Sequence, residues 1–390
     1  MKGRMALSKD ITALLAVTFL FFSSFNLLLS TFPVYISGLG FSQQIVGLFG
    51  GMFAFAAVLQ RPFLARLTDS WGRRAVLFVS AAATLIGPIL YMMSDDLVFL
   101  GGARILHAVS LAAFVVASQT LMADLAPEKQ RGSLMGLYVV ITGLPAVMFP
   151  PLGFYLLDNV GTAWLFAAAS LLGLLMVPAI AIISEPNRDE ESGLVASSGT
   201  VTGLLRNVNV LVAAAGIISV TMVFGAIITF LPLYGRSLGI LNVGVYFTAF
   251  ALAFMSGSAI SGRLGDLYSK RALVFPAFVL VALGIAVLLL LRSLLGLLIS
   301  AVITGLGFAA LQTLLLVFTV DSVSLRQRAQ AIGFFNNAFD LGVSVGGIAL
   351  GVVAAYSYDV LWLILMGLAL LGLLVCIRWL REPEEIASAE

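Results

Sequence analysis

Long apolar runs, separated by short polar segments, make up most of this chain. Twelve of these runs are long enough to cross a bilayer as helices, since a membrane helix needs about 20 apolar residues. Only helices suit a chain of this pattern, because a spanning segment must satisfy its own backbone hydrogen bonds. We therefore predict an all-α integral membrane protein whose twelve transmembrane helices occupy residues 11–37, 44–67, 75–93, 97–124, 132–157, 163–183, 208–235, 242–265, 272–291, 294–321, 331–355 and 360–380.

Basic residues are distributed very unevenly over the polar segments. Of the 21 lysines and arginines, 18 fall in segments that the predicted spans place on one side, together with both chain ends. Arg236 and Arg292 fall on the other side, and Arg104 lies within a span. Lysine and arginine mark cytoplasmic loops. We therefore expect a multi-pass protein of the plasma (inner) membrane with both termini in the cytoplasm.

The composition excludes several classes of function. Hydrophobic residues make up 61% of the chain and charged residues only 10%, whereas a soluble domain has about 25% charged residues. One cysteine and one histidine leave no disulfide framework and little for a metal site. We find no nucleophile–base pair and no phosphate-binding loop for ATP. We therefore expect no enzyme, no cofactor and no metal, and the net charge of +2 suggests no nucleic-acid partner.

A short charged motif occurs twice, 197 positions apart. Residues 65–74 read ARLTDSWGRR and residues 262–271 read GRLGDLYSKR, so Asp69 and Arg74 match Asp266 and Arg271. Asp124 and Arg131 match Asp321 and Arg328 at the same offset, which is about half of the 390 residues. Parallel repeats of this kind arise from duplicated six-span units.

The duplication predicts two six-helix bundles. We expect the first at residues 1–183 and the second at 208–390. The segment 184–207 between them is rich in acidic residues, serine and glycine. This composition is typical of a flexible linker, and the predicted orientation places it in the cytoplasm.

The repeated motif resembles the signature of the major facilitator superfamily, Gly-x-Leu-x-Asp-Arg-x-Gly-Arg-Arg. Ala65 and Ser70 replace its first Gly and first Arg, and the second copy keeps Gly262 but has Ser269 at the later Gly. Arg61-Pro62 resembles the drug and sugar efflux branch, which contains drug:proton antiporters. The resemblance implies two parallel-repeat six-helix bundles and secondary active transport by rocker-switch alternating access.

The resemblance also implies a cytoplasmic gate made by the loop charges. Opposite charges at helix ends pair with one another and with helix dipoles. The alternative is that the basic loops only set orientation, but acidic residues contribute little to orientation. The gate residues implied are Asp69, Arg73, Arg74, Asp124, Arg131, Asp266, Arg271, Asp321 and Arg328.

Few polar side chains lie inside the predicted spans, and they are not duplicated. Arg104 and His107, one turn apart, correspond to Ala301 and Thr304 in the second half. Ionisable residues within spans cost about 2.5–3.5 kcal/mol on insertion scales and are functional candidates. Because one substrate needs an asymmetric cavity, we expect the substrate and protons to be handled by Asn26, Arg104, His107, Asn336, Asn337 and Asp340.

Two of these residues allow two interpretations each. Histidine titrates near neutrality, with a reference pKa of about 6.5, so His107 is a candidate proton sensor. The alternative is a neutral histidine that hydrogen-bonds a neighbouring helix. Asp340 either couples transport to protons or makes a structural bond to a neighbour.

The sequence thus predicts a proton-coupled efflux transporter for small amphipathic molecules. The 28 phenylalanines and the few buried charges suit such substrates better than sugars or multivalent anions. Uptake or facilitated diffusion of a small nutrient is the alternative within transport. An alternative of another class is a lipid-moving protein or a non-transporting receptor. We expect the partners to be a small-molecule substrate, protons and the lipid bilayer, and the protein to be a monomer.

Overall fold

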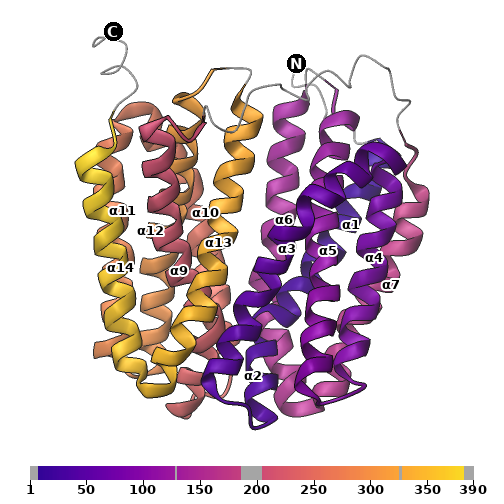
Figure 1. Ribbon diagram of the computed structural model, residues 1–390, viewed down its shortest axis with the longest axis horizontal. Coiled ribbons are helices and arrows are strands. Elements are labelled where there is room, and N and C mark those ends of the chain that lie inside the picture. Colours follow the sequence, from indigo (N-terminus) through magenta and orange to yellow (C-terminus); the bar gives the residue numbers. More distant parts are fainter. Residues whose placement is uncertain (1–7, 128–129, 186–203, 325–326, 382–390) are drawn as a thin grey trace. The chain divides into compact units, whose positions relative to one another are not determined.

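Helices account for nearly all of the described chain. The structure is a computed structural model that describes residues 8–127, 130–185, 204–324 and 327–381. The helices are labelled in Figure 1. In the first half they are α1 (Lys9–Leu29), α2 (Thr31–Gly38), α3 (Gln43–Trp71), α4 (Arg73–Tyr91), α5 (Leu97–Leu125), α6 (Arg131–Tyr155) and α7 (Thr162–Ile182). In the second half they are α9 (Val208–Ser237), α10 (Gly244–Leu267), α11 (Lys270–Leu290), α12 (Leu294–Asp321), α13 (Arg328–Tyr356) and α14 (Tyr358–Trp379).

The predicted membrane-spanning architecture is confirmed. Within the described residues, 12 helices are long and apolar enough to cross a membrane. The first span differs in detail, because it consists of α1 and α2, joined at Ser30. Pro33 explains this break, since proline has no N–H to donate to the carbonyl of Leu29 four residues earlier. The fifth span also differs, because α6 continues into a π-helical turn at Leu156–Val160.

The first unit packs its helices around α1. This helix contacts α6 and α7, and α4 contacts both α5 and α7. A cluster of buried hydrophobic side chains between these helices includes Phe21, Phe114 and Met122, each at most 1% exposed. The polar side chains of α1 are satisfied locally or across this core. Ser24, for example, donates to the carbonyl of Ala169 on α7 at 2.9 Å.

The second unit repeats the same pairing of helices. Here α9 contacts α13 and α14, as α1 contacts α6 and α7. Likewise α11 contacts α12 and α14, as α4 contacts α5 and α7. The packing therefore follows the 197-residue repeat of the sequence.

Helix α3 contributes to both units. Its residues from Met52 onward group with the first unit, whereas Phe41–Gly51 group with the second. In that second unit a Cβ atom on Gly47 would lie 2.6 Å from the carbonyl oxygen of Gly347, so only glycine permits this approach. The predicted range of the first bundle, 1–183, included this stretch. Most of the linker, 186–203, lies outside the described residues, and the division there stays a prediction.

Candidate functional site

Arg104 lies on α5 with only 4% of its surface exposed. Its guanidinium carbon is 4.0 Å from the centroid of the Phe32 ring and 4.6 Å from that of Phe53. These rings belong to α2 and α3, so helices of one unit enclose the charge with aromatic faces. A cation held against aromatic faces is stabilised by about 2 kcal/mol or more when it is desolvated. The first unit thus holds a buried, oriented cation within its membrane-spanning part.

His107 lies one turn further along α5 and is also 4% exposed. The hydroxyl of Tyr91, at the end of α4, forms a 3.0 Å hydrogen bond with Nδ1 of His107. The rings of His107 and Phe53 also make an edge-to-face contact, with centroids 5.2 Å apart. The structure therefore brings Arg104 and His107 together around Phe53.

The place of His107 against α4 has a counterpart in the second unit. A Cβ atom on Gly87 would lie 2.5 Å from Cγ of His107. At an offset of 197, a Cβ atom on Gly284 would lie 2.9 Å from the backbone nitrogen of Thr304. His107 and Thr304 thus occupy equivalent positions against a glycine of the third span in each half. This geometry favours the interpretation of His107 as a hydrogen-bonded packing residue.

The other predicted cavity residues lie on α1 of the first unit and on α13 of the second. Asn26 on α1 is 7% exposed, and its amide donates to the carbonyl of Phe22 at 2.8 Å within its own helix. Asn336 and Asp340 on α13 are half-buried, and Asn337 is exposed. The backbone carbonyl of Asp340 accepts a 2.7 Å hydrogen bond from Ser344. Their assignment to a substrate and proton cavity stays a prediction.

The charged loops form the same ion pair in both units. The Nε atom of Arg73 lies 3.0 Å from a carboxylate oxygen of Asp124, and Nζ of Lys270 lies 3.0 Å from one of Asp321. Each pair joins the start of the third span to the end of the fourth span. Lys270 was missing from the predicted set because Arg271 was aligned with Arg74. The 197-residue offset from Arg73 was the signal that could have identified it.

The second basic residue of each motif, Arg74 or Arg271, hydrogen-bonds a backbone carbonyl. Arg74 donates to the carbonyl of Ala181 at 2.8 Å, and Arg271 donates to the carbonyl of Ile377 at 3.0 Å. Both arginines therefore tie the third span to the end of the sixth within their own unit. Asp69, Asp266 and Arg328 are exposed at helix ends, and the side chain of Arg131 lies outside the described part of the chain. The role of all of these residues in a gate stays a prediction.

Each unit contains a cluster of aromatic rings. In the first, Phe21 stacks on Phe114 with centroids 4.0 Å apart, and Phe25 lies 5.9 Å from Phe53. The second cluster joins four helices, α9, α10, α12 and α13. Its neighbouring centroids lie between 4.9 and 6.4 Å apart, and it consists of Phe224, Phe250, Phe254, Phe308 and Phe339.

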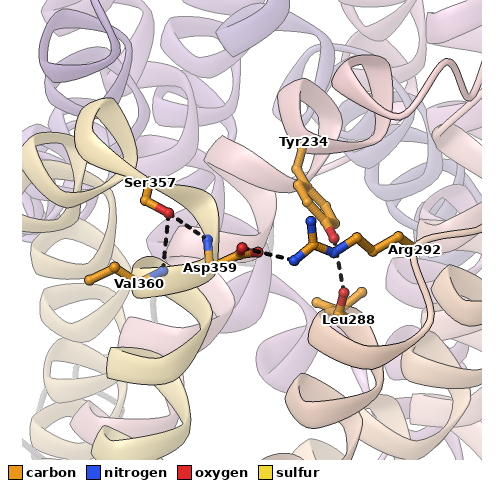
Figure 2. Close-up of polar contacts among 6 residues, drawn as sticks. All are labelled: Tyr234, Leu288, Arg292, Ser357, Asp359 and Val360. Atoms are coloured by element: carbon orange, nitrogen blue, oxygen red, sulfur yellow. Dashed lines mark hydrogen bonds and ion pairs between the residues drawn. The ribbon is translucent and has the colours of Figure 1, made fainter.

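At the end of each unit opposite the charged loops, a tyrosine hydroxyl donates a hydrogen bond to a backbone carbonyl of the third span. The hydroxyl of Tyr35 donates to the carbonyl of Tyr91 at 2.9 Å, and that of Tyr234 donates to the carbonyl of Leu288 at the same distance. Figure 2 shows the second of these bonds beside an ion pair of 2.8 Å between Arg292 and Asp359. Both members of this pair are about half exposed, so it contributes at most about 1 kcal/mol. Because both units contain this tyrosine hydrogen bond, it is part of the duplicated scaffold.

Comparison with known proteins decides the family. A model of the Major Facilitator Superfamily matches residues 14–246 and 239–390, which together span almost the whole chain. The chain belongs to this superfamily.

Members of the superfamily that resemble this chain in sequence include exporters. The Staphylopine export protein of Staphylococcus aureus is 25% identical over 403 residues, with 98% of each chain covered. The Multi-drug resistance efflux pump PmrA homolog of Lactococcus lactis is 28% identical over 273 residues, with 66% of each chain covered. The Quinolone resistance protein NorA of Staphylococcus aureus is 23% identical over 188 residues, with 48% of each covered.

Solved structures of the superfamily share the fold. A mutant of the nucleoside transporter NupG gives a TM-score of 0.78 at 16% identity, covering 94% of this chain and 99% of that one. The D-xylose-proton symporter gives the same TM-score at 14% identity, covering 97% and 99%. At these identities the likeness shows the twelve-helix fold alone.

Proposed function

We propose that this member of the superfamily exports small amphipathic molecules in exchange for protons, by rocker-switch alternating access. The observation that carries the proposal is the buried cation of Arg104 against two aromatic rings, at whose equivalent position the second half has Ala301. A site that differs between two equivalent units suits a single asymmetric substrate. The similarity to an export protein over 98% of both chains supports the outward direction.

The aromatic clusters support the substrate class. Ring faces bind apolar and cationic groups without requiring specific hydrogen bonds. The relatives include a multi-drug resistance efflux pump and a quinolone resistance protein, and we propose substrates of comparable amphipathic character for this chain. Proton coupling is assigned to Asp340, which is half-buried within a span.

Transport into inside-out vesicles tests this proposal. Because such vesicles expose the cytoplasmic face, we expect them to accumulate a fluorescent lipophilic cation such as ethidium when a proton gradient is imposed. Addition of a protonophore should abolish the accumulation. Accumulation that persists without the gradient would exclude proton coupling, and net uptake by right-side-out vesicles would favour nutrient import instead. Movement of labelled lipid without solute transport would support the lipid-moving alternative.

Replacing Asp340 by asparagine should uncouple transport from the gradient. We expect the Asp340→Asn variant to lower gradient-driven accumulation at least about fivefold, the lower limit of typical coupling free energies. Exchange of labelled for unlabelled substrate should persist, since exchange needs no net proton movement. The matched control is Asp69→Asn, an exposed carboxylate at the end of α3 that we assign to the gate. Equal loss of substrate binding in both variants would contradict the separation of cavity and gate.

The ion pair of Arg73 with Asp124 should affect transport more than stability. The two side chains are 18% and 29% exposed, so removing this partly buried pair by Asp124→Asn should cost about 1–2 kcal/mol of unfolding free energy, between the values for exposed and for buried pairs. If the pair serves the proposed gate, this variant should nevertheless slow vesicle transport. The exchanged variant Arg73→Asp/Asp124→Arg should recover part of the rate. If Asp124→Asn transports at the wild-type rate, the pair does not serve the gate, and the loop charges only set the orientation of the protein in the membrane.

A further inference from the structure

Tyr91 connects the two buried polar side chains of α5. It is the last residue of α4 and is only 1% exposed. Its hydroxyl forms the 3.0 Å hydrogen bond with Nδ1 of His107, and it is also hydrogen-bonded to the side chain of Arg104. Arg104, Tyr91 and His107 therefore form a polar triad between α4 and α5, within the first unit.

The chemistry of the three groups sets the direction of both bonds. A guanidinium has N–H donors and no acceptor, so Arg104 donates and the Tyr91 oxygen accepts. Nδ1 of His107 is then the group of the triad that can accept the single hydroxyl proton of Tyr91. Because a neutral imidazole has one donor and one acceptor nitrogen, Nε2 carries the ring proton. A proton on Nδ1 would instead leave Tyr91 facing two donors, and its own proton would lose this acceptor.

The ring of Tyr91 is itself held in place by α2 and α7. The backbone carbonyl of Tyr91 accepts the 2.9 Å hydrogen bond from Tyr35. Its ring centroid lies 4.6 Å from that of Phe32 on α2 and 5.6 Å from that of Phe166 on α7. Phe32 is also one of the two rings in contact with the Arg104 guanidinium. The Tyr91 hydroxyl therefore lies at a fixed position beside that guanidinium.

No member of the polar triad is repeated in the sequence of the second half. At the offset of 197, Tyr91, Arg104 and His107 correspond to Leu288, Ala301 and Thr304. The second unit nevertheless pairs its helices in the same way. The duplicated scaffold therefore does not require these three side chains, and their role belongs to the first unit alone.

We propose that Tyr91 and His107 are positioning residues for Arg104. Tyr91 holds the guanidinium against Phe32 and Phe53 by accepting one of its N–H groups. His107 accepts the Tyr91 proton, so that this proton points away from the guanidinium and a lone pair of the oxygen faces it. The role rests on the proposed function, which places Arg104 in the transport site.

The direction of the bonds can be measured without transport. His107 is the one histidine of the sequence, so nitrogen NMR of the full-length protein with isotope-labelled histidine reports on this residue alone. At neutral pH we expect an unprotonated, hydrogen-bonded Nδ1 and a protonated Nε2. Tyr91→Phe keeps the ring but removes the donor, and it should shift the Nδ1 signal. A protonated Nδ1 in the wild type, or an unshifted signal in Tyr91→Phe, would overturn the proposal.

Transport by inside-out vesicles tests the positioning itself. Tyr91→Phe should lower the initial rate at least about tenfold, the effect of losing one hydrogen bond to a charged group. His107→Gln should transport at close to the wild-type rate, because its side-chain carbonyl can accept the Tyr91 proton. His107→Leu has no acceptor and should lose transport as Tyr91→Phe does. Rescue by an acceptor is not expected of a residue that only fills space.

Tyr138→Phe is the matched control. Tyr138 is a tyrosine of the same unit that is 7% exposed, and its hydroxyl lies 2.8 Å from that of Ser118 on α5. This variant should lose about as much thermal stability as Tyr91→Phe but transport at close to the wild-type rate. Equal rates in the two tyrosine variants, or in His107→Gln and His107→Leu, would contradict the positioning role. A wild type that accumulates no substrate would instead contradict the proposed function, and the NMR result would then decide the triad alone.

Discussion

Replacing Arg104 by lysine should reduce transport to about a tenth of the wild-type rate or less. The guanidinium lies against the faces of Phe32 and Phe53, and it is only 4% exposed. Lysine keeps the positive charge but not the planar group that stacks on aromatic rings. Loss of one desolvated cation–π contact of about 2 kcal/mol corresponds to more than a tenfold effect. The initial rate of gradient-driven uptake by inside-out vesicles measures this change.

Arg292→Lys is the matched control for the substitution at Arg104. Arg292 is also an arginine that contacts a partner, but its side chain is 54% exposed, and its partner Asp359 lies in the first turn of α14. Exposed ion pairs contribute at most about 1 kcal/mol, so this variant should transport at close to the wild-type rate. Both variants retain their charge, and membrane insertion should not differ between them. Equal transport by the two variants would show that the aromatic surroundings of Arg104 are irrelevant to transport.

Replacing Gly173 by leucine should destabilise the first unit by about 3 kcal/mol, the upper end of overpacking costs. A Cβ atom at Gly173 on α7 would lie 2.6 Å from the backbone nitrogen of Leu85 and 2.9 Å from the carbonyl carbon of Thr84. Because both atoms belong to the backbone of α4, rotation of a side chain cannot relieve the contact. The two helices would have to separate. Thermal unfolding in detergent, followed by circular dichroism, measures the loss.

Gly102→Leu on α5 provides the control for Gly173→Leu. Apart from the chain neighbours of Gly102 and the backbone of its own helix, no described heavy atom lies within 4 Å of a Cβ atom built at Gly102. Leucine in a helix is favoured over glycine by up to about 1 kcal/mol, so this variant should be as stable as the wild type or slightly more stable. Gly173→Ala should fall between wild type and Gly173→Leu. Equal stability of Gly173→Leu and Gly102→Leu would contradict the close approach of α4 and α7.

The candidate site was only partly predictable from the sequence. The choice of Arg104 required nothing beyond a charge within an apolar run. Its partners Phe32 and Phe53 come from other helices, and nothing distinguished them in the sequence from the remaining phenylalanines. For His107, the sequence allowed both a titrating group and a packing residue. The bond to Tyr91 and the contact with Gly87 depend on how α4 and α5 pack.

The contacts of the duplicated charged residues were also only partly predictable from the sequence. The 197-residue offset identified Asp124 and Asp321 as equivalent, but the alignment of Arg74 with Arg271 drew attention away from Lys270. The structure assigns the two basic residues of each motif to different partners. Arg73 and Lys270 bind carboxylates, whereas Arg74 and Arg271 bind carbonyl oxygens at the ends of α7 and α14. Adjacent residues at the start of a helix point in directions about 100° apart, so they contact different neighbours.

The amino-acid sequence by itself determined the twelve spans, the all-helical class and the internal duplication. These features depend on local hydrophobicity and on the need of each span to satisfy its own backbone hydrogen bonds. Both can be recognised from the sequence of a single segment. Only the tertiary structure decided which side chains meet. It enclosed Arg104 with aromatic rings, placed His107 against Gly87, and brought a carboxylate oxygen of Glu185 to the backbone N–H of Arg73. Such contacts join helices that are distant along the chain, and their geometry is set by packing and not by the pattern of any single helix.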